Sequence, residues 1–168
     1  MFYECRSLIS IDLSNFENYV LNSIDNMFSY CISLKHINFN NFNTKNLVSM
    51  NGLFKGCKSL ESINLSNFNT LNLQNITNLF ENCISLTSVD ISNFNGSKIK
   101  RIDNIFYSCP NLTYIDISGL NIQSIASSEN LYVFNNNIPS SGKIIIKKKL
   151  ADLINGQIPS NWTKIIVE

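Results

Sequence analysis

Apolar side chains recur along this chain at a constant interval of 26 residues. The five cysteines mark the interval: Cys5, Cys31, Cys57, Cys83 and Cys109. A phenylalanine stands three positions before each cysteine, and apolar residues stand three, six and eight positions after it. Self-similarity at a fixed period is the signature of a tandem array of structural units. The pattern therefore predicts about five stacked units of equal length.

Within one unit, two hydrophobic periods follow each other. Residues 60–66 of the third unit alternate apolar and polar side chains through Ile63 and Leu65, which predicts a strand with one buried face. Between Leu73 and Cys83 the apolar residues fall at helical spacing. We therefore expect each unit to form a strand, a turn, a short helix or successive helical turns, and a return.

A single unit of this length buries too little apolar surface to fold alone, so neighbouring units have to stack. Stacking places equivalent strands side by side, about 4.8 Å apart, in a parallel sheet. Crossovers between parallel strands are almost always right-handed. The expected fold is thus an α/β right-handed solenoid. Its parallel strands would line the concave face, and its short helices or helical turns the convex face.

The repeated pattern C-x-x-L-x-x-I-x-L-x-x-F has the spacing of a leucine-rich repeat. Residues 27–44 and, more closely, residues 57–70 resemble the units of the BspA-like leucine-rich-repeat surface proteins. Those units read MF-x-x-C-x-S-L-x-x-L-x-L-S-x-F-x-T, and the resemblance covers about residues 1–132. It implies an exported or cell-surface protein used for adhesion or recognition.

Both ends of the array differ from its middle. Met1 aligns with Met27, so the chain begins inside a unit, and we expect it to be a piece of a longer array. Residues 133–168 depart from the register, and we interpret them as a C-terminal capping segment after a solenoid of residues 1–132. The BspA-like family commonly closes with a similar strand, helix and tryptophan.

The capping segment has its own predicted elements. Residues 143–148 are expected to form a strand and residues 149–155 a short helix, with Gly156 placed to stop it. Trp162 is expected to pack over the last apolar layer. Three lysines at positions 147–149 are either a patch for an anionic ligand or an ordinary solvated surface, and we favour the solvated surface.

Composition narrows the functional classes. Thirteen Lys and Arg against twelve Asp and Glu give a net charge of +1, which does not favour nucleic acid or an acidic membrane as partner. No apolar run approaches the length of about 18 residues that a membrane span needs, and no secretion leader is visible. Charged residues make up only 15% of the chain, while asparagine occurs 28 times.

Candidate chemistry is sparse. The cysteines form no C-x-x-C pair that would suit a metal, and we interpret them as small buried apolar residues. His36 lies five positions from Cys31, but the strand phase should turn it to solvent, which argues against a catalytic dyad. A calcium site between Asp90 and Asp116 lacks a loop of converging oxygens. We expect no enzyme activity, metal or cofactor.

The outward side of the predicted sheet is the remaining candidate site. Alternation along each strand turns polar residues outward, and solenoids bind partners on such extended surfaces. The candidate binding residues are His36, Asn38, Asn64, Asp90, Tyr114 and Asp116. We expect a recognition or adhesion module whose partner is a protein or glycan on a host or neighbouring cell. The alternative is a structural spacer with no ligand of its own.

Overall fold

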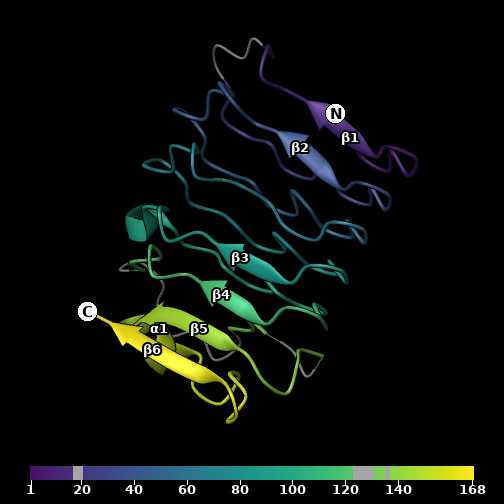
Figure 1. Ribbon diagram of the computed structural model, residues 1–168. Helices are drawn as coiled ribbons and strands as arrows, with labels where there is room; N and C mark the ends of the chain where they lie inside the picture. The colour runs from purple at the N-terminus through teal and green to yellow at the C-terminus, as the bar shows by residue number, and fades with distance from the viewer. Residues whose placement is uncertain (17–20, 123–130, 135–136) are drawn as a thin grey trace.

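Each repeat unit forms one coil of a stacked chain in the computed structural model, which describes residues 1–16, 21–122, 131–134 and 137–168 (Figure 1). We number the coils one to five by their cysteines. Six strands lie in chain order along one side of the stack: β1 (Ser10–Asp12), β2 (His36–Asn38), β3 (Ser88–Asp90), β4 (Tyr114–Asp116), β5 (Lys143–Lys147) and β6 (Thr163–Val167).

The strands pair in parallel at the step of the repeat. Ile11 lies opposite Ile37 between β1 and β2, and Val89 lies opposite Ile115 between β3 and β4. Each of these partners is one repeat away along the chain, so the predicted parallel stacking of equal coils is confirmed. β5 and β6 extend the second group, which gives sheets β1-β2 and β3-β4-β5-β6.

The third coil interrupts the sheet. Its residues 62–64 form no strand, so the predicted strand over residues 60–66 is wrong. At the entry to this segment, the N–H and hydroxyl of Ser59 both donate to the carbonyl of Ile32, 27 residues back along the chain. Asn111, the equivalent of Ser59 two repeats later, donates from Nδ2 to the Ile84 carbonyl at 2.7 Å, so the same contact also occurs where the sheet is intact. Toward the fourth coil the third coil keeps the ordinary step of 26 residues, with the Thr87 N–H donating to the Glu61 carbonyl at 3.1 Å.

Another side of the stack, which we call the turn face, comprises residues 24–31, 50–57, 76–83 and 102–109. In its second coil, alternate N–H groups donate to carbonyls of the third coil at 2.6 to 3.1 Å, and they belong to Ile24, Asn26, Phe28 and Tyr30. The intervening N–H groups close turns instead, as when Met27 donates to the Ile24 carbonyl at 3.2 Å. This alternation pairs backbone groups both within a coil and between coils.

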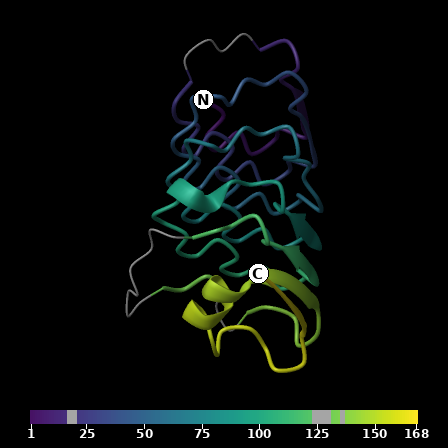
Figure 2. The same ribbon diagram turned by 90° about the vertical axis from the view of Figure 1, so that its left-hand side faces the viewer.

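The segment between Leu73 and Cys83 therefore forms successive turns rather than a short helix. Among the described residues of the five coils, the single helical element is the 3₁₀ turn η1 (Gly96–Lys98). Figure 2 shows this turn on the side of the stack away from the strands. Helical spacing of apolar residues is satisfied here because every turn sends one side chain inward.

Two columns of left-handed residues make these turns possible. One column has a member in each of coils two to five, and the other has a member in all five coils. Their φ angles lie between 54° and 71° at Asn26, Gly52, Asn78 and Asn104, and at Glu4, Tyr30, Gly56, Asn82 and Ser108. Glycine and asparagine tolerate this region better than other residues. Part of the asparagine content is thereby explained by the backbone.

Aromatic rings form a continuous column through the core. Stacked pairs with centroids 5.4 to 6.1 Å apart run from coil to coil through Phe2, Phe28, Phe54, Phe80, Phe106 and Phe134. Trp162 ends the column edge-on, 6.4 Å from Phe134. A second column contains Phe16, Phe42 and Phe68.

The C-terminal segment folds as expected within one or two residues. β5 is followed directly by α1 (Lys148–Leu153) and, after a turn, by β6. Trp162 is buried against the last ring of the column, and its indole N–H donates to the Pro139 carbonyl at 2.8 Å. The division of the chain at residue 132 stays a prediction.

Candidate binding surface on the strand face

The strand face is the outward side of β1 to β4 together with residues 62–66 of the third coil. His36, Asn64 and Asp90 are exposed on it, while Asn38, Tyr114 and Asp116 are half-buried. Pairing of β3 with β4 puts Asp90 directly opposite Asp116. His36 and Tyr114 occupy equivalent positions three repeats apart, so the structure does not bring them together.

The middle column of this face has a local structural role. Each member ends its strand segment in the same way: its side-chain Oδ1 accepts the backbone N–H of the residue two positions ahead, at 2.8 to 3.0 Å. The members are Asp12, Asn38, Asn64, Asp90 and Asp116. Such Asx turns let the chain leave an extended conformation. Our sequence interpretation missed this role, although an Asp or Asn followed two positions later by Ser or Asn repeats in all five units.

Electrostatics differ between the two ends of the face. Hydrogen bonds from Ser14 hold the pKa of Asp12 below its ordinary value. At the other end, burial and the nearby carboxylates of Asp116 and Asp90 raise the pKa of Tyr114. The ammonium of Lys143 lies 5.8 Å from the centre of the Tyr114 ring, within the range of a cation–π contact.

Two grooves flank the third coil where the sheet is interrupted. The N-side groove, of about 240 Å³, lies between the second and third coils and is lined by Ile37, Asn38, Phe39, Asn40, Asn64 and Asn67. The C-side groove, of about 300 Å³, lies between the third and fourth coils and is lined by Ile63, Asn64, Ser66, Asp90, Ser92 and Asn93. Three predicted site residues therefore line grooves that sequence reasoning did not foresee.

Backbone groups are left unpaired in these grooves. In three other coils the N–H that follows the middle column donates to the next coil at 2.9 Å, from Leu13, Ile91 and Ile117. Among the residues that the structure describes, the equivalent N–H groups of Phe39 and Leu65 have no hydrogen-bond acceptor. Both residues are buried, and Phe39 lines the N-side groove.

Amide side chains bridge the grooves at one end. Asn67 donates to Asn40 at 3.4 Å across the N-side groove, and Asn93 donates to the Ser66 carbonyl at 3.1 Å across the C-side groove. Asn64 lines both grooves, and its Oδ1 is occupied by the turn while its Nδ2 has no partner within the described chain.

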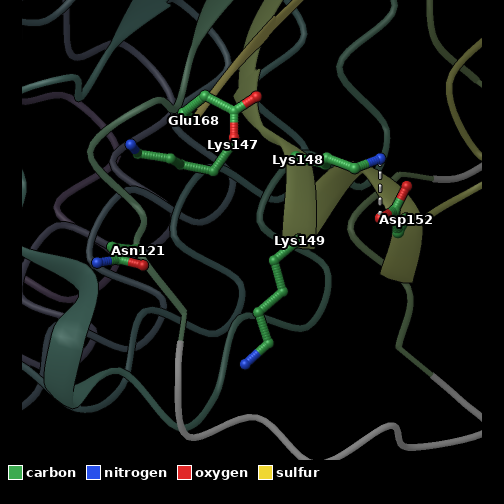
Figure 3. Close-up of a pocket in the computed structure, with 6 residues that line it drawn as sticks. All are labelled: Asn121, Lys147, Lys148, Lys149, Asp152 and Glu168. Atoms are coloured by element: carbon green, nitrogen blue, oxygen red, sulfur yellow. Dashed lines mark ion pairs between the residues drawn. The ribbon is translucent and has the colours of Figure 1, made fainter.

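A larger hollow of about 450 Å³ lies at the C-terminal end (Figure 3). Lys147, Lys148 and Lys149 line it together with Asn121 and two acidic residues, Asp152 and Glu168. Lys148 pairs with Asp152 at 3.6 Å, and both side chains are about two-thirds exposed. An exposed pair of this kind contributes little binding energy, which fits a solvated surface.

The cysteine column is buried and hydrogen-bonded. All five thiols are free, and only Cys5 is exposed. The thiols of Cys31, Cys57, Cys83 and Cys109 donate to phenylalanine carbonyls of the preceding coil at 3.0 to 3.2 Å. Burial raises the pKa of Cys31 to about 11 and that of Cys109 to about 12, so these thiols are poor nucleophiles.

The chemical alternatives raised by the sequence find no geometry in the described residues. The Cys31 thiol is bonded inside the core while His36 is exposed on the strand face, so the two form no dyad. Within the described ranges, no three His, Cys, Asp or Glu side chains group closely enough to hold a metal ion. Across the same ranges, no helix has the length and apolar character needed to span a membrane.

Comparison with known proteins places the chain in a family without assigning a role. No curated protein matches it. No solved structure matches it either. Residues 22–142, well over half of the chain, match the family model described as "Mycoplasma protein of unknown function, DUF285". The chain therefore belongs to the DUF285 family.

Proposed function

We propose that this chain is a non-enzymatic recognition or adhesion module of a cell-surface or secreted protein. The observation that carries the proposal is the strand face, where polar side chains stand in fixed register on successive coils. Exposed His36 and Asp90 and the half-buried Tyr114 add charge and aromatic surface to it. Extended surfaces of this type are the usual binding surfaces of solenoid proteins.

The resemblance to BspA-like leucine-rich-repeat proteins supports the same role. Units with the pattern of residues 57–70 imply, by that resemblance, display of the sheet to a protein or glycan on a host or neighbouring cell. The right-handed leucine-rich-repeat form, with the sheet on a concave face, is part of this proposal. Its mechanism is rigid presentation, since the coils are fixed to one another along the turn face.

A structural spacer is the second candidate, and a specific observation favours it. The middle column of the strand face stabilises strand ends through Asx turns, so its polar character needs no ligand to explain it. A continuous ring column would also suit a stiff rod that holds another domain away from a surface.

The repeat itself supplies substitutions that separate the two candidates. Asp90→Asn and Asp116→Asn keep the Oδ1 acceptor that Asn38 and Asn64 use naturally, and Tyr114→Ser introduces the residue found at position 88. We expect this triple variant to lose binding of the labelled chain to cultured host cells, with a melting temperature lowered by no more than about 4 °C.

The matched control changes exposed residues outside the strand face, with the substitutions Lys58→Ala, Lys100→Ala and Tyr132→Ala. Full binding by the control together with lost binding by the strand-face variant supports recognition. Binding that survives both sets of substitutions contradicts recognition by this face and favours the spacer.

A further inference from the structure

We propose that the two grooves beside the third coil bind a neutral carbohydrate chain, with successive sugar rings seated in the N-side and C-side grooves. This inference rests on the proposed recognition function and names its ligand class. It starts from the interruption of the sheet, beside which both grooves lie.

The rest of the third coil is bonded to its neighbours. On the turn face the third coil stays bonded to the fourth, with N–H to carbonyl distances of 2.7 to 3.0 Å from Met50, Gly52, Phe54 and Gly56. Ser59 joins the same coil to the second coil through the Ile32 carbonyl. These contacts fix the third coil on either side of its unpaired strand segment.

Unpaired polar groups make the grooves suited to a hydroxyl-rich ligand. The N–H groups of Phe39 and Leu65 lack acceptors among the described residues, and Asn64, whose Nδ2 has no partner within the described chain, lines both grooves. Buried backbone donors are nearly always paired, so water occupies these positions in solution. A hydroxyl can replace such a water because it both accepts and donates at the same geometry.

The lining favours a sugar over other ligands. Ile37 and Ile63 supply apolar floor for the C–H face of a ring, while the amides and the Asp90 carboxylate supply acceptors and donors for hydroxyls. An anionic ligand would meet the charge of Asp90 and no lysine or arginine in either lining. An extended peptide strand is disfavoured because the turn-face bonds keep the coils too close to admit another strand between them.

Spacing also fits a chain of rings. The grooves share Asn64 as a common wall, so their centres are separated by a single coil of about 4.8 Å plus the widening of the gap. Each volume lies at or below the small end of ligand sites, about 300 Å³, which suits one ring rather than a larger group. A linear oligosaccharide laid across the strands would place neighbouring rings in neighbouring grooves.

The test is a titration of the full chain, labelled with ¹⁵N, by maltotriose, cellotriose, chitotriose and lacto-N-tetraose. We expect one of these neutral probes to give saturable shifts of the Phe39 and Leu65 amide signals. Asn64→Asp keeps the Asx turn but replaces the free amide donor with a carboxylate, and it should weaken binding about tenfold. Asn95→Asp makes the same change at an Asx turn outside the strand face, where Oδ1 of Asn95 accepts the Ser97 N–H, and it should leave the affinity unchanged.

Several results would overturn the inference. They are the absence of shifts with all four probes at millimolar concentration, equal effects of Asn64→Asp and Asn95→Asp, or shifts produced only by a heparin hexasaccharide or an uncharged extended peptide. Failure here is distinguishable from failure of recognition. If cell binding depends on the strand face but no probe shifts the groove amides, recognition stands and the sugar does not. If a probe binds the grooves but cells are not bound, the sugar stands and adhesion does not.

Discussion

The ring column makes the sharpest prediction about stability. Phe80 is fully buried and stacks on Phe54 at 5.6 Å and on Phe106 at 6.0 Å, with interplanar angles of 11° and 1°. Phe2 begins the column, is half-buried, and stacks on Phe28 alone at 5.4 Å. Replacing each ring by leucine keeps an apolar side chain of similar size and removes the ring contacts.

The expected losses follow from the number of stacked partners. A volume-conserving apolar substitution in a core costs about 1 kcal/mol, and each lost aromatic pair adds about 0.5–1.5 kcal/mol. Phe80→Leu, which loses two pairs, should therefore lower the free energy of unfolding by about 2–4 kcal/mol. Phe2→Leu loses one pair at a partly solvated end and should cost about 1–2 kcal/mol.

Urea unfolding followed by far-ultraviolet circular dichroism and by Trp162 fluorescence measures both losses. Coincident transitions by the two signals would establish that the stack unfolds as a unit, which repeat arrays do not always do. An unchanged urea m-value would assign the loss to the native state. If Phe2→Leu and Phe80→Leu lower the free energy of unfolding by equal amounts, the reasoning is refuted, because the number of stacked partners would then not determine the loss.

Three further predictions concern the thiols, the left-handed turns and the Asx turns. At pH 8 a thiol reagent should modify Cys5 rapidly and the buried thiols only on unfolding. Because burial raises the pKa of those thiols, they ionise at lower pH in the unfolded chain than in the folded chain. The free energy of unfolding should therefore fall above about pH 8.5, by up to about 1.4 kcal/mol per pH unit for each thiol. A free energy of unfolding that does not change with pH in this range would contradict this. Gly56→Ala adds a Cβ 2.6 Å from the Tyr30 ring at φ 71° and should cost about 1–3 kcal/mol in urea unfolding, whereas Asn82→Gly in the same column should cost nothing. Asp116→Ala should cost about 1 kcal/mol and Asp116→Asn less than half of that, and equal costs would remove the Asx turn from the explanation.

The stacking of coils was predictable because it depends on spacing alone. Equal intervals between the cysteines place each one over the last, and the pairing of Ile11 with Ile37 follows from the same interval. The turn face was not predictable in the same way. Apolar residues from Leu73 to Cys83 fit a helix, yet the N–H groups there find acceptors one coil away, which a pattern within a single unit does not reveal.

The candidate site was predicted in composition but not in shape. Alternation along the strands predicts that His36, Asp90 and Tyr114 face outward, and in the structure His36 and Asp90 are exposed while Tyr114 is half-buried. The interruption at the third coil has no counterpart in the pattern, since residues 62–64 repeat the polar–apolar–polar order of residues 36–38 and yet form no strand. The grooves lie beside this interruption, so the repeat pattern did not predict them.

One side of each coil stabilises the stack, and another side carries the surface residues that can vary. On the turn face, backbone bonds, rings and thiols join each coil to the next, and Cys57 is tied through its thiol to the carbonyl of Phe28. The third coil loses its sheet pairing on the strand face and still stays in the stack, because the turn face holds it. Substitutions among the outward residues that do not form Asx turns should therefore alter binding while leaving the stack intact.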